Sequence, residues 1–477
     1  MHNLAVITTF TIPKVEVEGR RRDQNIQHPP GAFDVLTHDL TSEEQTISFC
    51  NSASKPFLIL ILPSMSRSLL ACGSNGAGQL ALGHEEDVPM FTPCKFDPSC
   101  GQVTQIDDLV SAASHSLLLV TTSDGDRKLL GAGTNSHNQL GLQCALTDCQ
   151  RAAPTFRPIS LQRAAGLGDD WIPTKIAATW TTSFVLYSHP STGEEKLVAC
   201  GSNDFGELSV SPGSSDTIVV VNLGLRPDER VELLRGGQRH VIAVLSQNGS
   251  QRVVGWGAAR RGELSAIPLP AAPRSAKGKG KAPARPSTLT PTAVDLVIPP
   301  GSRIVDISLG ASHSLALLSS GRVLAWGNDA KGQITGLDTV TGVRQIGATW
   351  GGSYLLTDEG ILSQGSNTHG QLLRDATDGD THAPIPLEGT PTALCAGTEH
   401  LLVMARGTAP HMPESLHVGG WNEHGNLGLG DAVDRPRLVR IKNVHSKGER
   451  VVSMWAGCAA SWIWLETAPD SNQTQEQ

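Results

Sequence analysis

Residues 71–83, ACGSNGAGQLALG, have the glycine content of a phosphate-binding loop. Such a loop needs backbone N–H groups that converge on the anion, usually at the N-terminus of a following helix. The residues that come next, through VPMFTPCKF, contain two prolines and show no helical periodicity. The stretch therefore has the composition of a nucleotide site but lacks the helix that such a site needs.

The cysteines do not form a metal site either. There are nine of them, none in a CxxC pair, and the closest spacing that resembles a ligand pair is Cys144 with Cys149. No second pair lies elsewhere to complete a zinc site, and an odd number of scattered thiols does not suit a disulfide framework. We expect a reduced intracellular protein with no metal and no cofactor.

Self-similarity explains the glycine-rich stretch. GSNGAGQL recurs as GTNSHNQL, GSNDFGEL, GAARRGEL, GNDAKGQI, GSNTHGQL and GWNEHGNL, at intervals of 60, 68, 56, 70, 38 and 55 residues. The copies begin at Gly73, Gly133, Gly201, Gly257, Gly327, Gly365 and Gly420. A phosphate loop is not repeated seven times in one chain, so we interpret this glycine motif as a turn that follows an apolar strand.

A second motif, a small-residue turn that enters a buried strand, alternates with the first. Its copies lie at 113–120, 179–187, 237–245, 311–318, 349–357, 397–405 and 457–465. Four of them carry a histidine at the same position: His115, His240, His313 and His400. Because these histidines recur with the repeat, we expect hydrogen-bonded core residues rather than ligands or catalytic bases.

The order of the two motifs predicts the topology. The first glycine motif has no strand motif before it, and the last strand motif has no glycine motif after it. Joined together, these two halves complete a seventh unit and remove the exposed sheet edges. We therefore predict an all-β fold, a seven-bladed β-propeller of about four strands per blade, closed by pairing N- and C-terminal strands in one blade.

Composition sets the domain bounds. We expect an N-terminal extension at 1–64, disordered or preceding the true start at Met65, then a propeller at 65–467 and a tail at 468–477. Residues 269–291 are rich in Pro, Ala and Lys and are predicted to be a disordered insert. Without the five positive charges of this insert, the net charge of −8 would fall to −13, so strong nucleic-acid binding is not expected. No segment suits a signal peptide or a membrane span.

The alternating motifs resemble the repeats of the regulator-of-chromosome-condensation family, whose members are seven-bladed propellers. The resemblance covers residues 66–467. Within that family, MSRSLLACGSNGAGQLALGH and the turns ATWTTSF and ATWGGSY are similar to the fungal alpha-tubulin suppressor, or killer-toxin-insensitivity, proteins. That resemblance implies a partnership with a small zinc-binding electron-carrier protein, in diphthamide synthesis and in Elongator-dependent modification of wobble uridine in tRNA. For the location we expect the cytoplasm and also the nucleus, since the basic insert has the composition of a nuclear localisation signal.

Three tryptophans stand where the repeat needs only a small residue. One position of the strand-motif turn is occupied in the seven units by Ala113, Trp180, Gln238, Ala311, Trp350, Thr398 and Cys458. The second position of the glycine motif carries Ser74, Thr134, Ser202, Ala258, Asn328, Ser366 and Trp421. Because indoles are enriched in binding hot spots, we interpret Trp180, Trp350 and Trp421 as partner-binding residues. The alternative is that they fill gaps between blades or in the central channel.

No serine elbow, HExxH motif, Walker loop or spaced carboxylate pair is present, so we do not expect an enzyme. A non-catalytic binding module is the leading hypothesis. The family's founding member implies a second one, guanine-nucleotide exchange on a small GTPase. A third is a general scaffold in trafficking or ubiquitin pathways.

Overall fold

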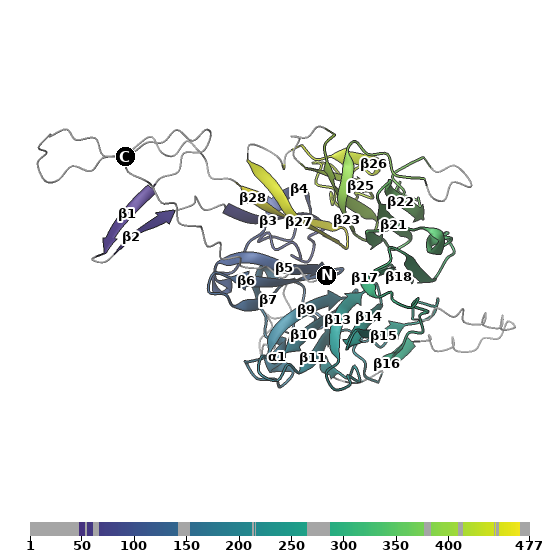
Figure 1. Ribbon diagram of the computed structural model, residues 1–477, viewed down its shortest axis with the longest axis horizontal. Helices are drawn as coiled ribbons and strands as arrows, with labels where there is room; N and C mark the ends of the chain where they lie inside the picture. The colour runs from purple at the N-terminus through teal and green to yellow at the C-terminus, as the bar shows by residue number, and fades with distance from the viewer. Residues whose placement is uncertain are drawn as a thin grey trace, which may run out of the picture. The chain divides into compact units, whose positions relative to one another are not determined.

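The protein is described from a computed structural model (Figure 1). The described residues are 47–52, 55–60, 66–141, 153–211, 214, 216–264, 287–375, 383–408, 414–442, 444 and 448–467, with backbone only for the two segments before residue 66. The chain divides into two units, Met1–Pro63 and Ser64–Gln477. In the first unit, which falls within the expected 1–64 extension, β1 (Ile47–Ser52) and β2 (Lys55–Leu60) pair as an antiparallel hairpin.

The second unit consists of seven antiparallel sheets, which we call blades. Blade 1 contains β5 (Val103–Ser111), β6 (His115–Thr122), β7 (Arg127–Gly133) and β8 (Ala153–Pro158). Blade 2 contains β9 (Ile172–Ala178), β10 (Thr182–Ser188), β11 (Glu195–Gly201) and β12 (Ile218–Val221). Blade 3 contains β13 (Arg230–Gly236), β14 (His240–Gln247), β15 (Ser250–Ala258) and β16 (Ser287–Ala293).

The remaining blades continue this order. Blade 4 contains β17 (Ile304–Leu309), β18 (His313–Leu318) and β19 (Val323–Gly327). Blade 5 contains β20 (Gln345–Ala348), β21 (Gly352–Thr357) and β22 (Gly360–Gly365). Blade 6 contains β23 (Thr390–Ala396), β24 (His400–Arg406), β25 (Ser415–Gly420) and β26 (Arg435–Arg440).

The closing blade confirms the predicted ring. It has the order β27 (Glu449–Gly457), β28 (Ala460–Thr467), β3 (Ser66–Gly73) and β4 (Val88–Pro93), so the last two strands of the chain pair with the first two of this unit. The seam is the β28–β3 ladder, which runs from Ala460 opposite Gly73 to Thr467 opposite Ser66. The first strands of the blades (β5, β9, β13, β17, β20, β23 and β27) contact one another in a closed cycle, and Figure 1 shows β5, β9, β13, β17, β23 and β27 around a common centre.

Two blades differ from the four-stranded expectation. In blade 4 a single 3-10 turn, η3 (Leu337–Thr339), packs against β19 in place of a fourth strand. In blade 5 the buried Arg374 side chain donates to the backbone oxygen of Ser363 in β22 at 3.0 Å. Blade 4 has too short a connection for an outer strand, because only 38 residues separate Gly327 from Gly365.

The expected insert at 269–291 overlaps β16. The outer strand of blade 3 begins at Ser287, where the threonine-rich STLTPTA pairs with β15, and residues 269–286 lie outside the described part of the chain. Threonine is favoured in strands because its branched side chain packs well on a pleated surface. The last five residues of the segment that composition marked, 287–291, therefore belong to a strand.

The glycine motif is a turn held by its own side chains. In six units the side chain of the third residue, Asn or Asp, accepts from the N–H of the eighth at 2.8–3.1 Å. In six units the seventh residue, Gln or Glu, accepts from the N–H of the fifth at 2.6–2.9 Å. The N–H groups that a phosphate would need are therefore already bonded inside the protein.

The first glycine of each motif has a steric cause. Its φ lies between 95° and 124° in all seven units. A Cβ there would stand 2.3–2.6 Å from a backbone oxygen of the strand-motif turn in the same blade. Only glycine tolerates both the left-handed backbone and this close approach.

The buried Asn422 tests this turn chemistry. Its side chain accepts from Leu427 N at 2.8 Å and donates to Asp431 O at 2.9 Å. We expect Asn422→Ala to lower the free energy of unfolding by about 3 kcal/mol, since it leaves buried backbone groups without partners. The matched control is Asn222→Ala, an exposed asparagine that accepts one backbone bond from Gly224. Equal urea midpoints for the two variants would contradict the role given to the motif.

Candidate functional site

Both sequence motifs open on the same end of the propeller, which we call the turn face. In blade 1, β5 ends at Ser111 opposite Ser116, and β6 begins at His115 opposite Gly133, where β7 ends. The strand-motif turn and the glycine turn therefore lie next to each other, and the other blades repeat this register. The turn face carries fourteen repeated turns, whereas the opposite end carries the hairpins between second and third strands.

Backbone hydrogen bonds link the strand-motif turns of neighbouring blades around the centre of the turn face. Trp180 N donates to Gln238 O at 3.0 Å, and Trp350 N donates to Thr398 O at 2.7 Å. Further bonds run from Ala113 N to Trp180 O, from Ala311 N to Trp350 O and from Thr398 N to Gly457 O. The turns that carry Trp180 and Trp350 are therefore fixed parts of the rim of the central channel.

The structure brings Trp180 and Trp350 together. They belong to blades 2 and 5, which are not neighbours in the ring, yet their ring centroids are 5.2 Å apart with the planes inclined by 33°. Both indoles are half-buried. The pair bridges the mouth of the channel and also keeps part of its surface toward solvent, so a structural and a binding role are both compatible with its position.

Sequence reasoning missed three residues that extend this pair outward. The Arg239 guanidinium carbon lies 6.0 Å from the ring centroid of Trp180 and 5.1 Å from that of Phe205. The Arg260 guanidinium carbon lies 5.2 Å from the same Phe205 ring. Trp350, Trp180, Arg239, Phe205 and Arg260 thus form one stack, which we call the aromatic–arginine ladder. Phe205, at a motif position held elsewhere by Ala, His, Arg or Lys, was the available signal.

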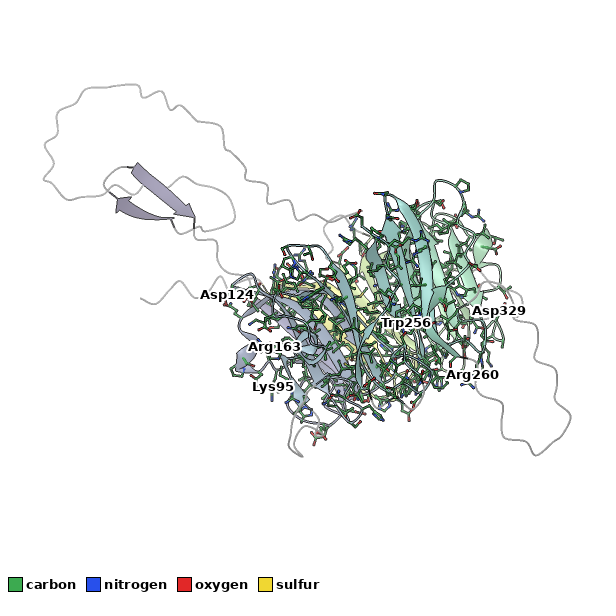
Figure 2. The ribbon with its side chains drawn as sticks, turned by 90° about the horizontal axis from the view of Figure 1, so that it is seen from below. Lys95, Asp124, Arg163, Trp256, Arg260 and Asp329 are labelled. Carbon is green, nitrogen blue, oxygen red and sulfur yellow. The ribbon has the colours of Figure 1, made fainter. Side chains whose placement is uncertain are left out.

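Charges hold the middle of the ladder in place. Arg239 Nη1 lies 3.6 Å from Asp204 Oδ2 and 3.5 Å from Oε1 of the buried Glu207. Burial raises the pKa of the Glu207 carboxyl, while its hydrogen bonds and Arg239 lower it. Arg260 is exposed, at the periphery of the molecule, whereas Trp256 of the preceding strand is buried in the blade (Figure 2).

Trp421 lies in a different setting. Its ring centroid is 6.2 Å from that of His369 and 5.4 Å from that of His424. Each histidine joins its blade to the next one, because His369 Nδ1 is 3.1 Å from Asp434 Oδ2 and His424 Nδ1 is 2.7 Å from Asp87 Oδ2. Trp421 therefore packs between two contacts that connect blade 5 to blade 6 and blade 6 to the closing blade.

The four repeated histidines are hydrogen-bonded core residues, as expected. Each is fully buried and its Nε2 contacts a serine hydroxyl of the next blade at 2.8–3.3 Å. The pairs are His115–Ser183, His240–Ser314, His313–Ser353 and His400–Ser461. In three of them the serine also contacts a backbone oxygen of the previous blade. These pairs have the composition of a nucleophile and a base, but both members of each pair are buried.

Burial shifts the protonation of these histidines. It lowers the pKa of His115, His313 and His400 to about 4 and that of His240 to about 3. The cause is loss of hydration for the charged imidazolium, with the neighbouring His313 adding to the shift of His240. The side chains are therefore neutral near pH 7 and act as joints between blades.

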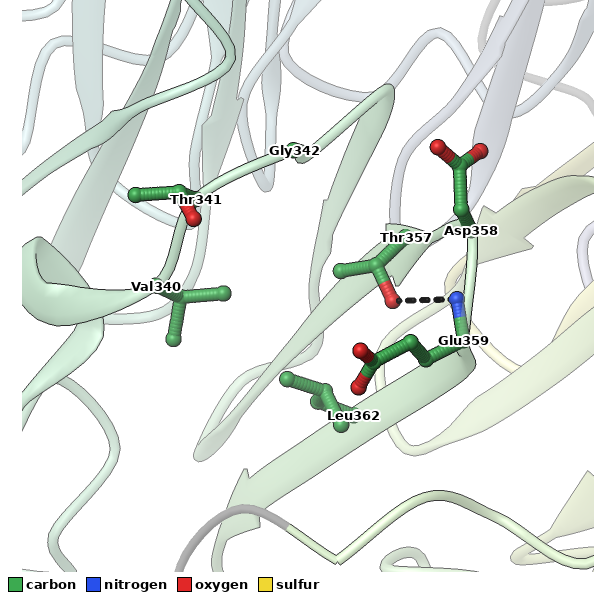
Figure 3. Close-up of a pocket in the computed structure, with 7 residues that line it drawn as sticks. All are labelled: Val340, Thr341, Gly342, Thr357, Asp358, Glu359 and Leu362. Atoms are coloured by element: carbon green, nitrogen blue, oxygen red, sulfur yellow. Dashed lines mark hydrogen bonds between the residues drawn. The ribbon is translucent and has the colours of Figure 1, made fainter.

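A pocket lies at the opposite end of the propeller from the turn face. This open cavity of about 320 Å³ is lined by Val340–Gly342, Thr357–Glu359 and Leu362 (Figure 3). The Thr357 hydroxyl accepts from Glu359 N at 3.2 Å and donates to Gly360 O at 3.1 Å, and Asp358 pairs with Arg344 at 3.0 Å. The Thr357 hydroxyl and the Asp358 carboxylate are therefore engaged in holding the hairpin.

Two further findings apply to the part of the chain that the structure describes. It contains no group of three or more His, Cys, Asp or Glu side chains placed to hold a metal ion, and Cys144 and Cys149 lie outside it. It also contains no helix with the length and apolar character needed to cross a membrane.

Comparisons with known proteins agree with this architecture. The model of the regulator of chromosome condensation (RCC1) repeat matches residues 304–333. The secretion-regulating guanine nucleotide exchange factor of Bos taurus is 26% identical over 77% of each chain. An RCC1 repeat-containing protein of Schizosaccharomyces pombe is 24% identical over 83% of this chain and 99% of its own length.

Solved structures show the same fold. Prp20p of Saccharomyces cerevisiae aligns with a TM-score of 0.61 at 18% identity, over 86% of this chain and 93% of that one. Human WBSCR16 aligns with a TM-score of 0.62 at 16% identity, over 85% and 100% of the two chains.

Proposed function

Because the chain belongs to the regulator of chromosome condensation repeat family, we propose that it is a non-catalytic propeller that binds a protein partner on its turn face. Propellers host many functions, so the proposal has to rest on a site and not on the fold. The site is the aromatic–arginine ladder. Binding hot spots are enriched in Trp, Tyr and Arg, which combine a large contact area with directed polar groups.

The partner that we propose is a small zinc-binding electron-carrier protein. The support is the resemblance of residues 65–84 and of the tryptophan turns at 178–184 and 348–354 to the fungal alpha-tubulin suppressor proteins. Those two turns place Trp180 and Trp350 in the ladder. The role that follows is assistance to diphthamide synthesis and to wobble-uridine modification by Elongator, in the cytoplasm and the nucleus.

Guanine-nucleotide exchange on a small GTPase is the second candidate. It is favoured by the relatives named secretion-regulating guanine nucleotide exchange factor in Bos taurus and Mus musculus, at 26% and 27% identity over 77% of this chain. Exchange needs a surface that binds the GTPase and displaces its nucleotide, and the turn face would serve here too. The two candidates differ in a measurable product, because only exchange releases labelled GDP.

Trp180→Ala and Trp350→Ala test the binding role. If the pair anchors a partner, each change should weaken binding by about 2 kcal/mol or more and leave the melting temperature nearly unchanged. If the pair only closes the channel, each should cost about 3–5 kcal/mol of folding stability, as for a buried aromatic. In a double-mutant cycle on the free energy of binding, the direct contact between the two indoles predicts a coupling energy of about 1 kcal/mol.

The measurements are melting curves and titrations with the purified zinc protein and, separately, nucleotide-release assays with small GTPases. Met90→Ala, an exposed apolar residue of the outer strand β4, is the control. Loss of stability with unchanged affinity of the folded fraction would remove the binding role. Normal binding of the zinc protein with loss of nucleotide release would favour the second candidate.

A further inference from the structure

Charges of opposite sign occupy opposite sides of the turn face. Blade 3 contributes Arg239, Arg260 and Arg261, which we call the basic arc. The glycine motif of blade 6, and the loops that follow the glycine motifs of blade 6 and the closing blade, contribute acidic residues, which we call the acidic arc: Glu85, Glu86, Asp87, Glu423, Asp431 and Asp434. In a ring of seven, blade 3 lies across the channel from blade 6 and the closing blade. The Trp180–Trp350 pair stands between the arcs.

The basic arc has unused charge at its outer end. Among the described residues no carboxylate pairs with Arg260 or Arg261, whereas Arg239 is held by Asp204 and Glu207. Both exposed arginines lie close enough to the buried Glu263 to lower its pKa, although burial raises that pKa by more. In the sequence, residues 265–286 follow Leu264 and carry five positive charges and no acid.

The acidic arc also presents charge to solvent. Asp87 and Asp434 are engaged with His424 and His369, and Asp431 with Arg435. Glu85, Glu86 and Glu423 are exposed beside them, and Glu86 Oε2 lies 3.4 Å from His84 Nδ1. The two arcs thus flank an aromatic centre with charges that the propeller itself neutralises only in part.

We propose that the turn face is a bipolar docking surface for a protein that carries an acidic cluster and a basic cluster on either side of an apolar contact. The proposal rests on the protein-binding function above and adds the partner's chemistry and orientation. Complementary potentials steer encounter and fix the register in which two surfaces meet. A nucleic acid, which is negative along its whole length, would gain from the basic arc but be repelled by the acidic arc.

The experiment uses the full chain and two fluorescein-labelled decapeptides, each with a central tryptophan and flanked by glutamates or by lysines. We expect Arg260→Glu/Arg261→Glu to lower the affinity for the glutamate peptide at least tenfold and to change the affinity for the lysine peptide by no more than twofold. Glu85→Lys/Glu86→Lys should lower the affinity for the lysine peptide at least tenfold and change the affinity for the glutamate peptide by no more than twofold. Two separate arcs are indicated if the arginine variant loses affinity for the glutamate peptide and gains none for the lysine peptide.

The controls separate local from net charge. Arg322→Glu/Arg406→Glu makes the same change in net charge at the opposite end of the propeller, where both arginines are exposed, and should change neither peptide by more than twofold. The effect of the Arg260 and Arg261 reversal should persist when glycine and serine replace 269–286.

Three outcomes would overturn the proposal: equal effects of all charge reversals on both peptides, no binding of either peptide at low salt, or tighter binding of a 20-nucleotide uridine RNA than of the acidic peptide. None of them depends on the zinc protein. If the peptides bind as expected and the zinc protein does not bind, the proposed partner is wrong and the proposal of a bipolar docking surface is retained.

Discussion

A chain that ends at Arg450 is expected to lose cooperative unfolding and to aggregate. The truncation removes β28 and most of β27, so β3 loses the ladder that joins it to Ala460–Thr467. Trp462 and Ile463, both fully buried, leave two core clusters at the same time. Truncation of one large buried side chain costs about 3–5 kcal/mol, and the net stability of a domain is about 5–15 kcal/mol. The edge of β3 that β28 covers in the closed ring would then be exposed and would template association.

The measurement is thermal and urea unfolding with light scattering. Removal of residues 1–64, which takes away the separate N-terminal unit, is the matched deletion and should leave the transition nearly unchanged. Trp462→Ala is a milder second variant for the case that the truncated chain does not fold. We expect it to lower the free energy of unfolding by about 3–5 kcal/mol. A truncated chain that melts like its parent would contradict closure of the ring by the terminal strands.

Acid should weaken the fold steeply below about pH 6.5, through the four buried histidines. An unfolded histidine takes up a proton below about pH 6.5, whereas His115, His313 and His400 stay neutral down to a pKa of about 4. Between these values the unfolded chain binds more protons than the native one, so stability falls as pH falls. Each histidine contributes up to about 1.4 kcal/mol per pH unit in this window.

The test is the slope of unfolding free energy against pH between 6.5 and 4.5. His115→Asn and His400→Asn should each reduce this slope by up to one proton, whatever their offset in stability. Asn422→Ala, which removes no titratable group, is the control and should keep the parental slope whatever its loss of stability. The buried Glu207 and Glu263 and the half-buried Glu399 have pKa values raised by loss of hydration and so act in the opposite direction, but they are unchanged in all variants. An unaltered slope in both core variants would show that these histidines do not control acid stability.

The ladder shows where sequence reasoning reached its limit. The unusual size of Trp180 and Trp350 was visible in the repeat, and so was their position at the same turn. Their mutual contact was not, because the residues are 170 positions apart and belong to blades that are not neighbours. Arg239 and Phe205 were overlooked since each looks like an ordinary solvent-facing turn residue until the neighbouring blade is beside it.

The sequence by itself determined the number of blades, the closure of the ring and the role of the repeated histidines. Each of these depends on interactions that are local or recur in every unit, such as the Asn and Gln bonds inside the glycine turn and the bond from His400 to the serine of the next blade. A local hydrogen bond requires a particular residue type at a fixed spacing, and because the spacing occurs seven times it can be recognised in the sequence.

The tertiary structure alone decided which side chains face one another across the channel. It also decided that η3 packs against β19 in blade 4, that Pro384 bridges to Leu362 of β22 in blade 5, and that the basic and acidic arcs lie on opposite sides of one face. These features depend on how seven blades divide a full circle, which no single repeat encodes. The contact between Trp180 and Trp350 therefore exists only once the ring has closed.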